Sequence, residues 1–371
     1  MKICILYDIP HHYRKGIWEK LSLDKDDEYY IYCDYIDKHS VKHIDKNEIK
    51  YYNDEGRLKI YPILKNIYYK NVLVFQNHLL GLIFSEKYDK YIFLGHYYSL
   101  STWISLLYLK LKKRPVFIWT HGAYGGEKKI KKMLVKAFYS LSDHLLLYGN
   151  YAKRILENDL KIKKKISVIY NSLDYENQIS IRNKVYKKQP IITEKYLIFI
   201  GRIERRKRVD ILIKAFNKLI LDKKYSSLNL VIIGDGSLLD DLRQWFSSTN
   251  ILFLGAIYEE SIIANYLFNA ELLVSPGHVG LNVIHSLTYG TPVITHNNFK
   301  HHAPEFEAIN PDKSGNFYLE NSIDDLCEVI KNWLKNTKYR ESIRNDCFNI
   351  IDNYWNPQYQ YEIIKKAIQN G

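Results

Sequence analysis

Residues 271–296 read ELLVSPGHVGLNVIHSLTYGTPVITH, and this stretch decides the fold class. An apolar run up to Ser275 predicts a strand, Pro276–Gly280 predicts a tight loop, and Leu281–Tyr289 has the spacing of a helix. A further strand begins in Pro292–Thr295. A strand, a short loop, a helix and another strand form the repeating unit of a parallel sheet covered by helices. The stretch therefore predicts a doubly wound α/β architecture.

The same alternation of strands and helices extends outward over the whole chain. Short β-branched or aromatic runs are separated by helix-length amphipathic stretches. The strand candidates before the central stretch are Lys2–Tyr7, Tyr29–Cys33, Lys90–Leu94, Val116–Thr120, His144–Tyr148, Ile166–Ile169, Tyr196–Gly201, Asn229–Gly234 and Ile251–Leu254. At 371 residues the chain is long enough for two domains. We expect two Rossmann-like doubly wound domains that face each other across a cleft.

The break between the two domains should fall in residues 175–193, which are polar, contain a proline and lack a clear period. This divides the chain into residues 1–188 and residues 189–354. A final segment, 355–371, begins at Trp355-Asn356-Pro357 and reads as a separate helix. We expect this last helix to return to the first domain.

Charge and composition limit the class of protein. The formal net charge is +13, and residues 101–190 alone carry 19 Lys and Arg against 6 Asp and Glu, whereas the rest of the chain has 35 of each. The four cysteines have no metal-binding spacing, and no apolar run is long enough to span a membrane. The first residues lack the pattern of a signal peptide. These observations predict a cytoplasmic enzyme or binding protein.

Three features at predicted strand ends suit an anionic ligand. Residues 196–216, YLIFIGRIERRKRVDILIKAF, place Arg202 and Lys207 in a basic loop between a strand and a helix. Gly236 follows another strand, in a turn where the backbone can approach a ligand. The amides from Gly280 to Asn282 begin the helix of the central stretch, where a phosphate is favoured. A solvated basic turn and ordinary turn chemistry remain open for the first two features.

Together these motifs resemble the C-terminal domain of the GT-B glycosyltransferases, in particular family 4, the "glycosyl transferases group 1" domain. The residues that carry the resemblance are Gly201-Arg202-Ile203…Lys207, Gly234-Asp235-Gly236, Phe253-Leu254-Gly255, and the block Ser275-Pro276…Gly280-Leu281…His285…Gly290-Thr291-Pro292-Val293-Ile294. The N-terminal half resembles the family more loosely, through residues 119–122 and 170–174. The resemblance implies a donor-binding C-terminal domain and an acceptor-binding N-terminal domain.

The resemblance assigns roles to individual residues. Arg202 and Lys207 match the basic pair that neutralises the donor diphosphate, and Gly280 and Leu281 match the helix-start amides that contact phosphate. Ile257 matches the edge that meets the base. Two further matches are Glu305, an acidic residue in a P-E turn, and His121, which in the family approaches the donor sugar from the N-terminal domain.

The sequence departs from the family at one motif. The family's two glutamates, eight positions apart, fall on Gly277 and His285. A histidine can still bind ribose hydroxyls as a donor or acceptor, whereas Gly277 has no side chain to touch the sugar. Nearby polar residues that could compensate are His278, Asn282, His296, His301 and His302. A structural or solvated role is the alternative for each of them.

Acceptor contacts are predicted at the strand ends of the N-terminal half. His11, His12 and Arg14 follow the first strand, and His96 follows a later one. An exposed helix entry is the alternative for the first three residues. His121 is the candidate general base or donor contact.

The function implied is transfer of a sugar from a nucleotide sugar, UDP- or GDP-linked, to a saccharide or an undecaprenyl-linked oligosaccharide. The setting implied is bacterial surface polysaccharide or lipopolysaccharide biosynthesis. The reaction is expected to need no metal or other cofactor and to retain anomeric configuration. The alternative is a non-catalytic or epimerase-type GT-B protein that binds a nucleotide sugar.

The basic segment of residues 127–138 is amphipathic, with apolar residues at helical spacing among lysines. Such a helix suits the anionic inner face of a membrane, which would make the protein peripheral there. The alternative is a solvated helix whose apolar face is core. A nucleic-acid partner is not predicted, because no nucleic-acid-binding motif accompanies the charge.

Overall fold

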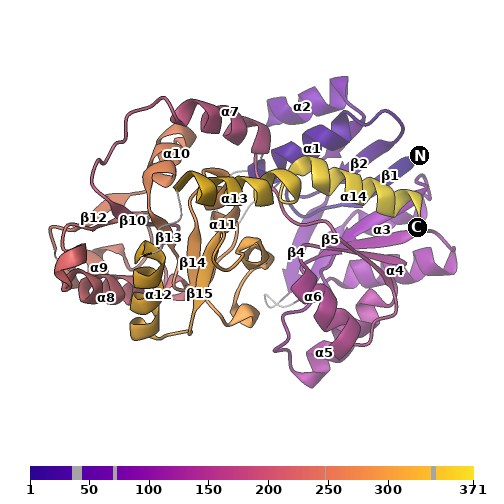
Figure 1. The fold of residues 1–371 in the computed structure, drawn as a ribbon. Coiled ribbons are helices and arrows are strands. Elements are labelled where there is room, and N and C mark those ends of the chain that lie inside the picture. Colours follow the sequence, from indigo (N-terminus) through magenta and orange to yellow (C-terminus); the bar gives the residue numbers. More distant parts are fainter. Residues whose placement is uncertain (36–43, 70–72, 247, 336–339) are drawn as a thin grey trace. The chain divides into compact units, whose positions relative to one another are not determined.

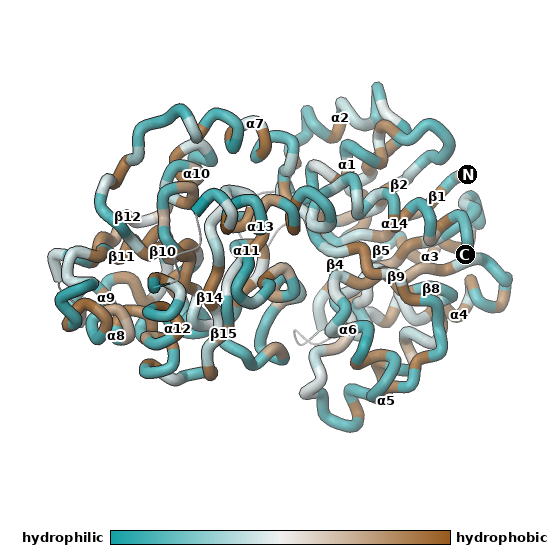
Figure 2. The backbone as a smooth tube through the Cα atoms, viewed as in Figure 1, coloured by the Kyte–Doolittle hydropathy of each residue, from teal (hydrophilic) through white to brown (hydrophobic). Residues whose placement is uncertain are grey.

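A computed structural model describes residues 1–35, 44–69, 73–246, 248–335 and 340–371. They form two compact units, residues 1–174 together with 356–371, and residues 175–355 (Figure 1). Each unit has a parallel sheet with helices packed against it, and hydrophobic residues concentrate in the strands (Figure 2). The predicted architecture of two Rossmann-like α/β domains is confirmed.

The N-terminal unit is built on a seven-stranded parallel sheet of order β3-β2-β1-β6-β7-β8-β9. Its strands are β1 (Lys2–Leu6), β2 (Glu28–Tyr32), β3 (Leu58–Tyr61), β6 (Lys90–Leu94), β7 (Val116–Thr120), β8 (His144–Leu147) and β9 (Lys165–Val168). All five residues of β7 are buried, as expected of a strand covered on both faces. A separate antiparallel pair, β4 (Lys65–Tyr69) and β5 (Leu73–Asn77), was not predicted.

Helices cover both faces of this sheet. They are α1 (Lys15–Ser22), α2 (Lys46–Glu55), α3 (Leu79–Phe84), α4 (Leu100–Leu111), α5 (Lys129–Tyr139), α6 (Asn150–Arg154) and α14 (Pro357–Gln369). One core packs α1 and α14 against the sheet through residues such as Trp18 and Ile368. The other packs α3, α4 and α5 through residues such as Leu106 and Phe138. Among the described residues no helix is both long enough and apolar enough to cross a bilayer.

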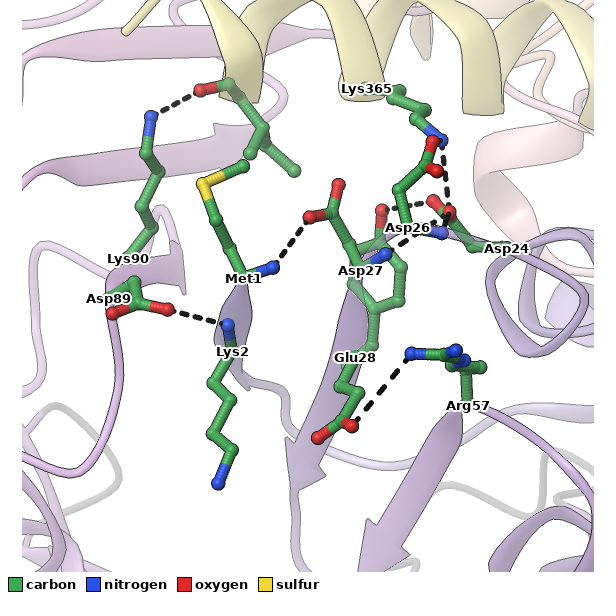
Figure 3. A network of polar contacts seen from close by, with 12 residues as sticks. Met1, Lys2, Asp24, Asp26, Asp27, Glu28, Arg57, Asp89, Lys90 and Lys365 are labelled. Atoms are coloured by element: carbon green, nitrogen blue, oxygen red, sulfur yellow. Dashed lines mark hydrogen bonds and ion pairs between the residues drawn. The ribbon is translucent and has the colours of Figure 1, made fainter.

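Helix α14 is anchored in the N-terminal unit by polar contacts (Figure 3). The Lys365 ammonium lies 2.9 Å from the Asp24 carboxylate and 2.6 Å from Asp26. Burial alone would raise the pKa of Asp24, but hydrogen bonds from the Asp26 amide and Lys365 lower it to about 2. The Lys90 ammonium, from β6, donates to the Ile368 carbonyl. The last helix is therefore part of the first unit's structure.

The C-terminal unit has a six-stranded parallel sheet of order β12-β11-β10-β13-β14-β15. Its strands are β10 (Tyr196–Ile200), β11 (Asn229–Ile233), β12 (Ile251–Gly255), β13 (Leu272–Val274), β14 (Val293–His296) and β15 (Gly315–Tyr318). Its helices are α7 (Tyr175–Val185), α8 (Val209–Ile220), α9 (Leu239–Trp245), α10 (Glu260–Asn269), α11 (Asn282–Thr288), α12 (Ile323–Lys335) and α13 (Arg340–Asn353). The order reverses between β10 and β13, the kind of point where α/β sheets bind ligands.

The boundary between the units differs from the predicted one. The break lies between Asp174 and Tyr175 instead of at residues 188 and 189. The supposedly aperiodic segment begins with helix α7, whose Gln178 donates a 3.0 Å hydrogen bond to Glu260 at the start of α10. Arg182 of α7 also pairs with Asp352 at 2.8 Å. These contacts hold α7 in the second unit, and its weak amphipathic pattern hid it from the sequence prediction.

Candidate functional site

The predicted donor-binding residues follow the carboxyl ends of adjacent parallel strands in the C-terminal unit. Ile257 follows β12, Gly236 follows β11, and Arg202 and Lys207 follow β10. The segment after β13 contains Gly280, Leu281, Asn282 and His285, and Glu305 follows β14. Because the carboxyl ends of parallel strands meet at one edge of a sheet, all of these residues lie along the same edge.

Lys207 joins two of these segments. It ends the short 3₁₀ helix Arg205–Lys207, and its ammonium donates a 2.7 Å hydrogen bond to the His278 carbonyl. Burial, together with the charges of Arg206 and Arg202 and against the opposing effect of Glu204, lowers the pKa of Lys207 to about 8. The ammonium is therefore charged at neutral pH but titrates close to it.

Gly277 is required by the close approach of these two loops. Its amide donates to the Lys207 carbonyl at 3.1 Å, and the His278 amide donates to Arg206 at 3.0 Å. A Cβ atom at Gly277 would lie 2.2 Å from the Arg206 carbonyl oxygen. No side chain fits there unless the loops separate, so the family's first glutamate is excluded by packing.

The helix start after β13 differs from its prediction. Helix α11 begins at Asn282, and the Gly280 amide, predicted to be free for phosphate, donates to the Asn282 side-chain oxygen at 3.0 Å. Leu281 is the N-cap residue. Glu305 is buried, and its Oε2 lies 3.9 Å from where a Gly280 Cβ would stand. The structure thus brings Gly280, Asn282 and Glu305 together, with the amide already capped by Asn282.

His285 is paired with a carboxylate that the sequence prediction missed. Its Nε2 lies 2.9 Å from Glu260, which also accepts hydrogen bonds from Tyr289 at 2.6 Å and Gln178 at 3.0 Å. Burial would raise the pKa of Glu260, but His285, Tyr289 and Gln178 together lower it to about 2. A negative charge therefore lies beside position 285, although it comes from α10 and not from α11.

Two of the proposed compensating histidines support the loop after β13. His302 Nδ1 accepts from the Val279 amide at 3.2 Å, and its Nε2 lies 2.8 Å from the His296 carbonyl. Burial lowers the pKa of His302 to about 3 and that of His296 to about 4, so both rings are neutral at pH 7. With Nδ1 accepting, the His302 proton must be on Nε2. His301 is exposed and pairs with Glu320 at 2.8 Å.

The remaining donor candidates are held less tightly. Arg202 is 61% exposed and lies 3.5 Å from Glu204, which also pairs with Arg206 at 3.1 Å. Ile257 is half-buried in the loop between β12 and α10. Gly236 has φ +155°, and a Cβ there would lie 2.5 Å from the Ile203 carbonyl oxygen, so the turn needs glycine.

The N-terminal unit has a cavity of about 370 Å³ at the carboxyl ends of β1, β6, β7 and β8. It brings together four predicted residues, His11, Arg14, His96 and His121, whereas His12 does not line it. The His121 ring lies 4.7 Å from the Tyr148 ring. Residues from three separate segments of the sequence therefore share one site.

Partners of these residues were missed because they follow other strands. The Asp8 carboxylate lies 3.2 Å from His96 Nδ1. The Arg14 guanidinium is buried and donates a 2.5 Å hydrogen bond to the Tyr148 hydroxyl. Asp8 comes directly after a predicted strand and Tyr148 is the last residue of another, and a place at a strand end is the signal that could have marked them.

Comparison with known proteins decides the family. Residues 31–177 match the family model described as Glycosyltransferase Family 4, and residues 181–347 match the model described as Glycosyl transferases group 1. The fold is similar to that of Anabaena HepE, solved in complex with UDP, with a TM-score of 0.71 at 13% identity over 100% of both chains. The chain belongs to the family 4-like GT-B glycosyltransferases.

Two curated relatives are more similar in sequence. An uncharacterized glycosyltransferase of Methanocaldococcus jannaschii is 24% identical over 56% of this chain and 53% of its own length. A Campylobacter jejuni enzyme, named as an N-acetylgalactosaminyltransferase acting on a diphospho-undecaprenol-linked acceptor, is 26% identical over 58% of this chain and 57% of its own. The chain thus spans little more than half the length of these relatives.

Proposed function

We propose that this glycosyltransferase transfers a sugar from a UDP- or GDP-sugar to a saccharide or undecaprenyl-linked acceptor, in bacterial surface polysaccharide biosynthesis. The observation that carries the proposal is the pairing of Lys207 with the loop after β13, which places a half-buried cation beside the start of α11. Preorganised positive charge of this kind stabilises a leaving diphosphate. We propose that no metal or cofactor is required, because Lys207 and Arg202 neutralise the diphosphate.

The departures from the family motif fit this role. When the His285 Nε2–H group donates its hydrogen bond to Glu260, the Nδ1 atom can accept a hydrogen bond from a ribose hydroxyl. Ile257 would then contact the base of the nucleotide, and Glu305 would lie on the side of the loop that faces the donor sugar. His121 would act as the base or as the contact to the donor sugar, and we propose a retaining reaction, in which the leaving phosphate helps to deprotonate the acceptor.

The test is thermal stabilisation of the purified protein by nucleotides and nucleotide sugars, followed by a transfer assay. Mass action gives about 2.7 kcal/mol of stabilisation at a hundredfold excess over Kd. A selective shift with one nucleoside diphosphate, and transfer of its sugar to a saccharide, would support the proposal. Epimerised donor without transfer would support the epimerase-type alternative instead, and no shift with any nucleotide would refute a donor site.

The pKa of Lys207 predicts how donor binding depends on pH. The ammonium binds diphosphate only when protonated, and in the free protein it loses its proton as pH rises through about 8. UDP affinity should therefore be constant below pH 8 and fall by about tenfold per pH unit above it. Calorimetric titration from pH 7 to pH 10 measures this. The control is Lys207→Arg, which stays charged and should give a flat profile; the same profile in both proteins would contradict the assignment.

We further propose that the N-terminal unit docks on an anionic membrane surface. On α5 the residues Ile130, Met133 and Leu134 are 75%, 71% and 47% exposed, so this part of the predicted apolar face is not core, whereas Phe138 of the same face is buried. Leu107 and Leu111 of the neighbouring α4 are 50% and 83% exposed. Lysines surround both helices. An exposed apolar stripe among lysines is the pattern of a helix that lies in a membrane interface.

Loss of two lysines should measurably weaken this docking. Lys128 and Lys129 are exposed, and each lysine near an anionic surface contributes about 1 kcal/mol, so Lys128→Gln with Lys129→Gln should lower binding about thirtyfold. Co-sedimentation with vesicles of phosphatidylglycerol and phosphatidylcholine measures the binding. The matched control is Lys187→Gln with Lys188→Gln, an exposed pair in the other unit. Equal losses in the two variants would refute docking through α5.

A further inference from the structure

The cavity of the N-terminal unit has a buried cation at its wall. Arg14 is only 3% exposed, and one of its nitrogens, Nη2, donates to the Tyr148 hydroxyl. Its Nε and Nη1 atoms are buried and have no hydrogen-bond partner among the described residues. No described carboxylate forms an ion pair with it, and the nearby carboxylate of Asp8 is paired with His96 instead.

Aromatic rings surround this cation. The guanidinium carbon lies 5.0 Å from the centre of the Tyr148 ring and 5.4 Å from the rings of Trp119 and Tyr13. Such contacts offset part of the cost of burying a charge, but they do not satisfy the N–H groups. An unpaired buried charge costs several kcal/mol, and buried charges of this kind cluster at ligand-binding sites. The empty hydrogen-bonding capacity of Arg14 therefore points to an anion.

The rest of the cavity fits a sugar. Aromatic rings from several elements line the cavity, and two histidines stack on tyrosine rings. The ring centres of His11 and Tyr13 are 5.3 Å apart, and those of His96 and Tyr98 are 5.0 Å apart. The apolar face of a pyranose packs on such rings, while the ring nitrogens of the histidines suit its hydroxyls. A volume of about 370 Å³ accommodates one sugar residue with a charged substituent.

We propose that the acceptor carries an oxyanion, a carboxylate or a phosphate, bound beside its sugar ring over the Arg14–Tyr148 pair. The Tyr148 hydroxyl accepts a hydrogen bond from Arg14 and so holds the guanidinium at the cavity wall. This inference rests on the proposed function only in naming the ligand an acceptor; the anion preference of the cavity stands without it. The two sources of the anion are an acidic sugar and the phosphate of a lipid-linked sugar.

Helix α5 connects this site with the proposed membrane face. Lys131 and Val135, on α5, line the cavity, and the Lys131 ammonium lies 5.7 Å from the Tyr97 ring. The exposed apolar residues lie on the same helix. A saccharide attached to a membrane lipid could therefore enter the cavity from beside α5, with its phosphate near a second cation.

The experiment measures binding of three small probes by ligand-observed NMR titration at constant ionic strength. The probes are methyl glucoside, which is neutral, methyl glucuronide, which carries a carboxylate, and glucose 1-phosphate. At least one anionic probe should bind at least tenfold more tightly than the neutral one, and the probe that does so identifies the source of the anion. Equal binding of all three would overturn the proposal.

Arg14→Met tests which residue carries the preference. It should weaken binding of the anionic probe about thirtyfold or more and leave binding of methyl glucoside unchanged. It should also raise the melting temperature, because it removes an unpaired buried charge. The control Arg57→Met removes an exposed arginine of the same unit and should keep the preference. Persistence of the preference in Arg14→Met would overturn the proposal.

Two further measurements keep the outcomes separate. Tyr148→Phe retains the ring but removes the hydroxyl that positions Arg14, and it should reduce the anion preference several-fold even if Arg14→Met does not fold. UDP-induced thermal stabilisation should be unchanged in both variants, because the residues predicted to bind the nucleotide lie in the other unit. If UDP does not stabilise the unaltered protein but the anion preference is present, the proposed function is refuted and this inference stands.

Discussion

Replacing Gly277 by glutamate, the residue found there in the family, is expected to abolish nucleotide binding and not to improve it. The new Cβ would lie 2.2 Å from the Arg206 carbonyl oxygen and 2.8 Å from the Lys207 Cα. Both are backbone atoms, so the loop before α8 must move away from the loop after β13. That movement breaks the hydrogen bond between Lys207 and His278 and removes the cation from its place. We expect a loss of about 3 kcal/mol in unfolding free energy.

Urea unfolding and UDP calorimetry of Gly277→Glu measure both effects, and Gly277→Ala separates packing from charge. The alanine variant should already lose most of the stability, because the clash begins at Cβ. Gly280→Ala is the matched control in the same loop: its Cβ would meet the Ala303 methyl at 3.7 Å, an ordinary contact. It should change stability by less than about 1 kcal/mol. A stable Gly277→Ala with unchanged UDP affinity would contradict this account.

The fold could be predicted largely because its central strands are continuous apolar runs. β6 and β7 were predicted with the observed bounds, since burial on both faces leaves polar residues only at their ends, Lys90 and Thr120. The edge strands β3 and β15 were missed. Each has four residues, and each includes a residue that disfavours strands, Lys59 in one and Gly315 in the other. Pairing with a neighbouring strand stabilises them, and pairing is a tertiary property.

The candidate sites could be predicted only as far as a motif or a strand end marks them. Gly236, Lys207 and the block after β13 could be placed along one sheet edge, because each follows a parallel strand and no other information is needed for that placement. Glu260 was missed because it reaches His285 across 25 positions, and no local pattern reports such a contact. The capping of the Gly280 amide by Asn282 was missed for a different reason: an asparagine two residues later can cap or bind a ligand, and only side-chain direction distinguishes the two.

Charge repulsion should exclude the family's second glutamate from position 285, whereas packing excludes the first from position 277. His285→Glu would place a carboxylate beside Glu260, whose charge His285 now stabilises at 2.9 Å. Both side chains are largely buried, with 19% and 26% of their surface exposed. Two adjacent carboxylates in such a place repel, and we expect unfolding free energy to fall by about 3 kcal/mol at pH 7. The matched control is His301→Glu, which faces Glu320 from a side chain 63% exposed and should cost less than about 1 kcal/mol.

The pH dependence of stability distinguishes this repulsion from a packing defect. In the unaltered protein the pKa of Glu260 is lowered to about 2, so its contribution is present above the unfolded value of about 4.3 and is lost as pH falls towards 2. In His285→Glu a shared proton raises one carboxyl pKa, so stability should instead increase as pH falls from 7 to 5. Adding Glu260→Gln should restore most of the loss at pH 7, because the amide donates to the new carboxylate. Urea unfolding at pH 5 and pH 7 measures all three proteins, and a double variant no more stable than His285→Glu would show that position 285 excludes glutamate by shape and not by charge.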